Sequence, residues 1–446
     1  MIQRDTIAAI ATAPGRGGIG VVRVSGHDLA RFASTLIPRS LEPRRAMLTA
    51  FCDADGQPLD EGIALFFPAP NSYTGEDVIE LQGHGGPVVM RQLLQRCVEL
   101  GARPSRPGEF TERAYLNGRM DLAQAEGVAD LIEASTALGA RAALRSLSGE
   151  FSQLIQQLTL KVVALRTLLE ATLDFPEEEV EFLTAGRAAD QLIAIREQLD
   201  RVMASTRQGS LLRDGIQAVL IGEPNVGKSS LLNRLAGNDV AIVTDVPGTT
   251  RDAVREQIDI DGLPVHIIDT AGLRETEDAV ERIGISRTWA QIEKADLALV
   301  VSDAAGNNDA GSQAIIERLP VALARIRVLN KIDLAGRPAA IETRGNEDFV
   351  WLSAKTGAGL DRLKRAIWDR AGWHPSGEGL FTARARHIAA LQSAQSHLAQ
   401  ASEQTSRLEL YAEELRLAHE ALCTITGEFT PDDLLGEIFS KFCIGK

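Results

Sequence analysis

The run from Gly222 to Ser229, with the letters GEPNVGKS, has the residue types and spacing of a phosphate-binding loop. Its glycines let the backbone bend, so that successive N–H groups can point at phosphate oxygens. Lys228 would reach the β- and γ-phosphates of a nucleotide, and the hydroxyl of Ser229 would bind Mg²⁺. The same letters could form an ordinary glycine and proline turn, but the flanking sequence argues against that interpretation.

The segments on both sides of this loop have the patterns that the motif requires. Residues 216–221 (IQAVLI) form a short apolar run typical of a buried strand, and residues 230–235 (SLLNRL) have the pattern of a helix start. A helix that begins at the loop adds a partial positive charge facing the phosphates. The strand, loop and helix together therefore predict a nucleotide-binding site.

Two motifs further along the chain indicate which base the nucleotide carries. Residues 330–333 (NKID) follow one apolar strand, and residues 353–355 (SAK) follow the apolar run 349–352. The carboxylate of Asp333 can accept hydrogen bonds from N1–H and from the exocyclic amine of guanine. Adenine offers neither donor at those places, so ATP would leave a buried acid unpaired.

Taken in order, these motifs resemble those of the GTPase superfamily, which has a Ras-like P-loop fold. Residues 269–272 (DTAG) follow the apolar run 265–268, and their acid and glycine N–H would serve the Mg²⁺ shell and the γ-phosphate. The resemblance implies that Thr250 binds Mg²⁺ in the GTP state. The predicted GTP contacts are Asn225, Val226, Gly227, Lys228, Ser229, Ser230, Thr244, Asp245, Val246, Pro247, Gly248, Thr249, Thr250, Asp269, Thr270, Ala271, Gly272, Asn330, Lys331, Asp333, Ser353, Ala354 and Lys355.

The residue after Gly272 bears on how GTP would be hydrolysed. Ras-like proteins carry a glutamine in this neighbourhood that positions the attacking water, whereas this chain has Leu273. The water therefore needs another group, and the sequence assigns no arginine finger. A monovalent cation held by the Asn225 amide oxygen and by carbonyls of residues 244–249 could offset charge in the transition state. An arginine from a partner could do the same.

The hydrophobic patterns divide the chain into α/β and all-α parts. Residues 1–118 are predicted to form an N-terminal α/β domain, 119–213 a set of helices, 214–375 the P-loop domain and 376–446 further helices. The economical interpretation is one helical bundle with the P-loop domain inserted into it. Two separate small helical domains fit the pattern as well.

Several local patterns add detail to this division. A stripe at helical spacing predicts a long amphipathic helix, and its members are Leu154, Leu158, Val162, Leu165 and Leu169. A second helix is predicted over residues 188–204, ending before Gly209. The glycine-rich residues 15–18 are expected to form a plain turn, although such a turn could also hold an anion, and the acidic residues 177–179 a solvated loop.

Composition restricts the partners and the compartment. The 446 residues include 47 Lys and Arg against 61 Asp and Glu, a net charge of −14, so we expect no broad basic face for nucleic acid. Four cysteines without metal-like spacing indicate a reducing compartment. The absence of a long apolar run and of a signal peptide predicts a cytoplasmic protein that contacts no membrane.

The resemblance to known proteins extends beyond the nucleotide motifs. Residues 106–114 (RPGEFTERA), 117–126 (NGRMDLAQAE) and 280–285 (VERIGI) are similar to segments of the MnmE (TrmE) family of tRNA-modifying GTPases. The most distinctive segment is the end of the chain, residues 433–446 (DLLGEIFSKFCIGK), which other translational GTPases lack. The chain thus resembles that family over its whole length.

This resemblance implies an enzyme that hydrolyses GTP and acts in tRNA modification with an FAD-containing partner, MnmG (GidA). Together they would add a carboxymethylaminomethyl or aminomethyl group to C5 of the wobble uridine of certain tRNAs. The family forms homodimers through its N-terminal domain and heterotetramers with that partner. It also binds a one-carbon folate, similar to 5-formyltetrahydrofolate, and the matching positions here are Arg23, Glu80, Arg119 and Lys446.

The resemblance also implies roles in catalysis. K⁺ would do the work of an arginine finger, and its predicted ligands are Asn225, Thr244, Val246 and Thr249. Glu281 would orient the catalytic water through a second water, beside the phosphate contact of Lys228. Cys443 is a candidate catalytic thiol, although it could also be a small buried residue of the bundle. Without the resemblance, Arg23, Glu80 and Arg119 could be members of a surface ion pair.

Two other functions fit parts of the sequence. A ribosome-assembly GTPase would share the nucleotide motifs, but such proteins usually add a basic RNA-binding module, and no basic block occurs here. A folate-responsive scaffold would bind GTP only to set its shape. Replacing Glu281 by Ala would separate the scaffold from the enzyme, since only the enzyme needs GTP hydrolysis for modification.

Overall fold

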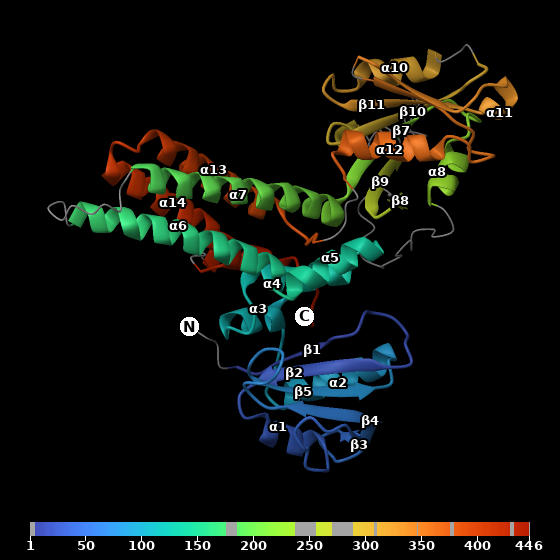
Figure 1. The fold of residues 1–446 in the computed structure, drawn as a ribbon. Helices are drawn as coiled ribbons and strands as arrows, with labels where there is room; N and C mark the ends of the chain where they lie inside the picture. The colour runs from blue at the N-terminus through green and yellow to red at the C-terminus, as the bar shows by residue number, and fades with distance from the viewer. Residues whose placement is uncertain are drawn as a thin grey trace. The chain divides into compact units, whose positions relative to one another are not determined.

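The computed structural model describes residues 5–174, 185–236, 256–269, 289–306, 310–345, 347–374, 379–428 and 432–445 (Figure 1). They form two compact units. Unit 1 comprises residues 1–129, 146–192 and 393–446, and unit 2 comprises residues 130–145 and 193–392. Each unit combines one sheet with helices, which confirms the predicted mixture of α/β and all-α parts.

The sheet of unit 1 has the strand order β3-β4-β5-β2-β1-β6. Its strands and covering helices are β1 (Ile7–Ile10), β2 (Gly20–Gly26), α1 (Leu29–Leu36), β3 (Met47–Cys52), β4 (Pro58–Phe67), β5 (Asp77–Gly83), α2 (Pro87–Glu99) and β6 (Arg103–Pro104). Side chains alternate between the two faces of a strand, so Val22, Val24 and Ile79 share one face and are buried against α1 and α2. The opposite face carries Arg23 and Glu80, which are direct neighbours on β2 and β5.

Further helices lie outside the two sheets, and some of them have residues in both units. They are α3 (Glu109–Leu116), α4 (Leu122–Glu133), α5 (Ala137–Leu147), α6 (Glu150–Asp174), α7 (Ala185–Asp214), α13 (Ala385–Glu403), α14 (Leu408–Thr426) and α15 (Asp432–Ser440). α6 lies along α14, and the predicted stripe from Leu158 to Leu169 is fully buried. At the start of the stripe, Ile155 is buried and Leu154 is only half-buried.

The prediction that the second helix ends before Gly209 is wrong. α7 continues through Gly209 to Asp214. The glycine is required by packing, because a Cβ at this position would clash with the carbonyl oxygen of Phe381. A glycine inside a helix usually destabilises it, so the close approach of a second segment explains why the helix carries one here.

Unit 2 contains a seven-stranded sheet in the order β12-β13-β11-β10-β7-β9-β8. Its strands are β7 (Ile216–Ile221), β8 (Glu256–Ile260), β9 (Leu263–Asp269), β10 (Leu297–Asp303), β11 (Ala324–Asn330), β12 (Ala340–Arg344) and β13 (Glu347–Trp351). The five inner strands are parallel, and the edge strands β8 and β12 are antiparallel to their neighbours. The described helices around the sheet are α8 (Lys228–Ala236), α10 (Ala310–Arg318), α11 (Ile332–Ala335) and α12 (Leu360–Ala371).

Both faces of this sheet are covered, as expected for parallel strands. One core cluster joins β7, β11 and β13 to α8 and α12, and a second joins β7, β9 and β10 to α10. In parallel sheets, ligands bind where the carboxyl ends of the strands meet. This edge of the sheet carries the ends of β7, β9, β11 and β13, which lead into the four predicted nucleotide motifs.

The two segments that lead into and out of the sheet of unit 2 are tied to each other. The amide of Gln208 donates to the carbonyl of Gly372 at 2.7 Å and accepts from the backbone N–H of His374 at 2.9 Å. Nearby, the buried carboxylate of Asp130 accepts from Arg213 at 2.8 Å and from Arg384 at 2.7 Å. Side-chain hydrogen bonds therefore join the segment before β7 to the segment after α12.

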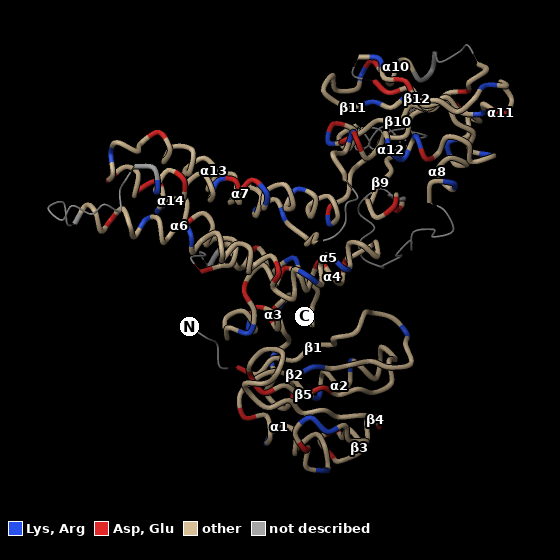
Figure 2. Tube along the Cα trace, viewed as in Figure 1, with Lys and Arg blue, Asp and Glu red and all other residues tan. Residues whose placement is uncertain are grey.

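The long helix α7 carries residues of both charges. Basic and acidic side chains are interspersed along α7 (Figure 2). No helix in the described ranges is long and apolar enough to cross a membrane.

An ionic network in unit 1 joins α3 to β6. Glu109 is buried and accepts hydrogen bonds from Arg103 at 2.7 Å and from Arg113 at 3.2 Å. Burial alone raises the pKa of Glu109, but the hydrogen bonds from Arg103, from the backbone of Arg106 and from Arg113 outweigh it. They lower the pKa to about 2.

Unit 1 is therefore expected to lose stability in acid. The folded-state pKa of Glu109 lies below the unfolded-state value of about 4.3, so its contribution is complete above about pH 4.3 and is lost as the pH falls towards 2. Glu109→Gln should lower the free energy of unfolding at pH 7 by about 1–3 kcal/mol and flatten this acid dependence. Urea unfolding at pH 7 and pH 3 measures both effects. If the free energy of unfolding of the variant fell with pH as steeply as that of the unchanged chain, Glu109 would not be the source of the acid dependence.

Candidate functional site

The phosphate loop connects β7 to α8 with a left-handed backbone at two positions. Asn225 has φ +64° and Gly227 has φ +97°. Only glycine fits at 227, because its φ is unfavourable for other residues and an added Cβ would clash with the amide nitrogen of Asn330. Within the loop, the ammonium of Lys228 donates to the carbonyls of Gly222 at 2.7 Å and Glu223 at 3.1 Å. Its side chain thus stays inside the curve of the loop.

Asn330 ties the phosphate loop to two other motifs. It ends β11 and is 2% exposed. Its amide nitrogen donates to the carbonyl of Val226 at 2.8 Å, and its amide oxygen accepts from the backbone N–H of Ala354 at 2.9 Å. One buried side chain therefore holds together the loop, the end of β11 and the segment 353–355.

The group predicted to contact the base is held by a hydroxyl. Ser353 is fully buried and donates to the carboxylate of Asp333 at 2.6 Å. Lys331 has a left-handed backbone, with φ +64°, and its ammonium contacts Asp303 at 2.8 Å. The hydrogen bond from Lys331 lowers the pKa of Asp303. The motifs 330–333 and 353–355 thus meet around Asp333.

Part of the predicted nucleotide site is not in the described residues. Residues 225–230, 330–333 and 353–355 lie at the carboxyl edge of the sheet, and β9 ends there at Asp269. The residues outside the described ranges are Thr244, Asp245, Val246, Pro247, Gly248, Thr249, Thr250, Thr270, Ala271, Gly272, Glu281 and Lys446. Roles assigned to these residues stay predictions.

The described donors suit the predicted metal ions chemically. Ser229 lies in the first turn of α8 with an exposed side chain, and Asn225 is also exposed. Their hydroxyl and amide oxygens are hard donors of the kind that Mg²⁺ and other hard cations accept. Ser229 would hold Mg²⁺ and Asn225 would contribute to holding K⁺.

Unit 1 brings together part of the predicted folate site. Arg23 and Glu80 pair at 2.9 Å across β2 and β5, with side chains 15% and 18% exposed. Arg23 also donates to the carbonyl of Gly445 at 3.3 Å, and its guanidinium lies over the ring of Tyr73. The pair is half-buried beneath the C-terminal tail, so the alternative of a plain surface ion pair does not describe it.

The other predicted residues of this region are placed differently. The stem of Arg119 lies beside Gly75, where an added Cβ would be 3.3 Å from its Cγ. Cys443 is exposed, which is at odds with the alternative that it is a buried packing residue. Its carbonyl accepts from the backbone N–H of Gly108 at 3.3 Å, so the tail is anchored next to α3.

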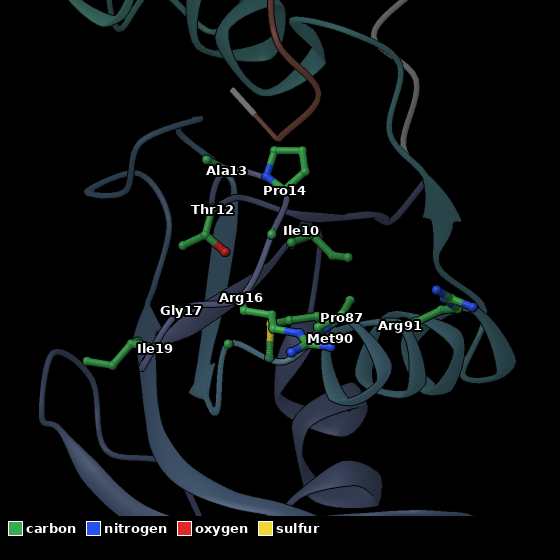
Figure 3. Close-up of a pocket in the computed structure, with 12 residues that line it drawn as sticks. Ile10, Thr12, Ala13, Pro14, Arg16, Gly17, Ile19, Pro87, Met90 and Arg91 are labelled. Carbon is green, nitrogen blue, oxygen red and sulfur yellow. The ribbon is translucent and has the colours of Figure 1, made fainter. Parts of the chain in front are cut away.

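A cavity of about 520 Å³ opens between the glycine-rich loop and α2 (Figure 3). The loop supplies Thr12, Pro14 and Arg16, and α2 supplies Met90 and Arg91. Residues 15–18 were expected to form a plain turn, and Gly15, Arg16 and Gly17 of this segment also line the cavity. The glycine-rich turn, which could hold an anion, was the signal in the sequence for this region.

The seven-stranded sheet, the phosphate loop and the guanine motifs define a P-loop GTPase. Two family profiles match the chain. The one described as GTP-binding protein TrmE N-terminus covers residues 6–119, and the one described as MnmE helical domain covers residues 122–443. The chain therefore belongs to the MnmE (TrmE) family.

Relatives from two other bacteria match this chain over nearly its whole length, and a solved structure matches part of it. The tRNA modification GTPase MnmE of Azoarcus sp. (strain BH72) is 62% identical over 444 residues, covering 99% of this chain and 98% of the relative. The protein of the same name from Nitrosomonas europaea is 56% identical and covers all of both chains. Among solved structures, the G domain of the T. maritima FeoB iron transporter is 27% identical with a TM-score of 0.27, covering 35% of this chain and 98% of that chain.

Proposed function

We propose that this chain is a K⁺-activated GTPase that acts in tRNA modification. Its relatives are named tRNA modification GTPases. With an FAD-containing partner of the MnmG (GidA) type, it would add an aminomethyl or carboxymethylaminomethyl group to C5 of the wobble uridine. It would work in the cytoplasm as a homodimer and as a heterotetramer with that partner. The observation that carries the GTPase part is Asn330, which joins the phosphate loop to the base-reading segment.

Within the proposed reaction, the described residues have separate tasks. Lys228 and the loop N–H groups bind the phosphates, and Asp333, oriented by Ser353, recognises guanine. Leu273 offers no polar group to the attacking water, so Glu281 would orient it. K⁺ on Asn225 would offset the charge that develops on the transferred phosphoryl group.

The proposed folate site is built around Arg23 and Glu80, which lie beneath the C-terminal residues of the chain. Glu80 supplies a carboxylate acceptor for the amino and N–H groups of a pterin, and Arg23 supplies donors next to two aromatic rings. These groups fit a reduced folate, which would supply a one-carbon unit there. Arg119 and Lys446 complete the proposed set by family position.

GTP hydrolysis is expected to be at least about tenfold faster in KCl than in NaCl of equal ionic strength, because K⁺ held by Asn225 would stabilise the charge of the transition state and the smaller Na⁺ would fit the same ligands less well. Asn225→Ala should remove this difference and leave GDP affinity within about threefold. The measurement is kcat at saturating GTP and Mg²⁺ in each salt. Equal rates for the unchanged chain in both salts would show that K⁺ takes no part in the mechanism, and an arginine from a partner would then be the candidate for its role.

The role in modification has its own test. A strain that lacks the native gene is complemented with the chain or with Glu281→Ala, and the wobble nucleosides of its tRNA are measured by mass spectrometry. We expect modified uridine with the former and none with the latter, while both proteins bind GDP. Modification by a variant without hydrolysis would favour the scaffold function. Normal GTPase activity without any effect on tRNA would contradict the proposal itself.

A further inference from the structure

α5 packs as a part of the GTPase unit, although it precedes the phosphate loop by many residues in the sequence. Residues 130–145 fall in unit 2 together with the seven-stranded sheet. Ala142 is 2% exposed and belongs to the same core cluster as Leu212, at the end of α7, and Ile216, at the start of β7. The helix is thus anchored to the strand that carries the phosphate loop.

The first residues of α5 contact the turn between β8 and β9. Thr136 is 6% exposed, and its hydroxyl accepts a hydrogen bond from the backbone N–H of Gly139 at 3.0 Å, which caps the helix. The same hydroxyl donates to the carbonyl oxygen of Gly262 at 3.3 Å. A single buried hydroxyl therefore both begins the helix and binds the turn.

Neighbours of Thr136 extend this contact. The side chain of Leu138 lies over Gly262, where an added Cβ would be 2.7 Å from its Cδ2. Ser135 accepts a hydrogen bond from the amide of Gln257, in the first half of β8. The contact thus includes the turn and the strand that leads to it.

The turn itself is well defined. Ile260 pairs with Leu263, so the hairpin closes through two residues, Asp261 with φ 49° and Gly262 with φ +96°. Positive φ at both central residues is typical of the tightest hairpin turns. Lys364 in α12 binds the carboxylate of Asp261, the other residue of the turn, at 2.9 Å. The turn of the hairpin therefore contacts both α5 and α12.

This hairpin connects the two segments that respond to the nucleotide in GTPases. β8 begins six positions after Thr250, the predicted Mg²⁺ ligand, and β9 ends at Asp269, which opens the DTAG motif. In GTPases these segments change their arrangement with the γ-phosphate and Mg²⁺. A paired hairpin transmits a displacement at either end to its turn, because its ladder of hydrogen bonds resists shear.

We propose that Thr136, supported by Leu138, is a positioning residue for GTP hydrolysis. By holding the turn at Gly262, it fixes the positions of β8 and β9, and so of the segment that precedes β8 and of the DTAG motif that follows β9. It thereby couples α5 to the state of the nucleotide. This proposal rests on GTPase activity alone. It does not depend on the proposed role in tRNA modification or on K⁺, since all variants are compared in one KCl buffer.

The test uses the full chain and distinguishes the two hydrogen bonds of the Thr136 hydroxyl, one from Gly139 and one to Gly262. Thr136→Ser keeps both bonds. Thr136→Asp keeps the cap but puts an acceptor against the carbonyl of Gly262. We expect wild-type kcat for the serine variant and a kcat about three- to tenfold lower for the aspartate variant, with unchanged GDP affinity. A matched control is Thr206→Val, which removes a buried hydroxyl of α7 that binds only the carbonyl of Val202 in its own helix.

Two results would overturn the proposal. One is a folded aspartate variant with wild-type kcat, and the other is an equal loss of kcat in Thr206→Val, which would indicate a general effect of stability. If the aspartate variant does not fold, Leu138→Ala takes its place, since it removes the packing on Gly262 and leaves the cap. Its kcat should also fall while GDP affinity is kept, and a wild-type rate would contradict the proposal equally.

Discussion

Asp333→Asn is expected to weaken GTP binding by at least about a hundredfold and to create binding of xanthosine triphosphate. Ser353 fixes the carboxylate at 2.6 Å, so its oxygens are oriented before the base arrives. Each charge-assisted hydrogen bond contributes about 1.5–3 kcal/mol, and the amide replaces one acceptor by a donor. Xanthine has a carbonyl where guanine has the exocyclic amine, so the asparagine N–H can donate to it. Calorimetry with both nucleotides measures the exchange.

The control for this substitution is Asp369→Asn. It makes the same chemical change at an exposed acid near the end of α12 and should leave GTP affinity unaltered. If the Asp333 variant were folded and bound GTP like the unchanged chain, Asp333 would not be the group that reads the base.

Asn330→Ala is expected to have the next largest effect, because one side chain supports two loops. The substitution leaves the carbonyl of Val226 and the N–H of Ala354 buried without this partner. Each unsatisfied group costs about 1–3 kcal/mol, so the free energy of unfolding of unit 2 should fall by about 2–4 kcal/mol. GDP affinity should fall about ten- to a hundredfold, since the phosphate loop loses its support. Urea unfolding and titration with a fluorescent GDP analogue measure the two effects.

The matched control here is Asn233→Ala on the exposed face of α8, which should change neither quantity by much. A normal GDP affinity for a folded Asn330 variant would show that the loop keeps its shape without this tie. A loss of affinity without a loss of stability would instead place Asn330 in direct contact with the nucleotide.

The parts of the fold that could be predicted from the sequence are those with local signals. The phosphate loop, the strands that end at Asp269 and Asn330 and the helix after Lys228 each show apolar runs or motifs within a few residues. The meeting of residues 330–333 and 353–355 followed from a general rule, because parallel strands bring their carboxyl ends to one edge.

Features that depend on distant contacts could not be predicted in this way. Gly209 looked like a helix end, but its role is set by Phe381, which lies far along the chain. Strand β3 and helix α1 were not predicted, because their apolar residues form short runs whose burial depends on contacts with the rest of the core of unit 1. The assignment of α5 to the GTPase unit depends on its packing against β7 and the β8–β9 turn, and periodicity shows only that it is a helix.

The tie between the two ends of the GTPase sequence has a consequence for how such a chain can arise and be re-engineered. Gln208 bridges to Gly372 and His374, and Asp130 bridges Arg213 to Arg384, so the strand-bearing segment enters and leaves at nearly one place. A segment with adjacent ends can be gained or exchanged as a cassette without separating the helices that receive it. A short glycine linker in place of residues 215–372 would have little distance to span. The same junction would accept a foreign GTPase cassette with similarly close ends.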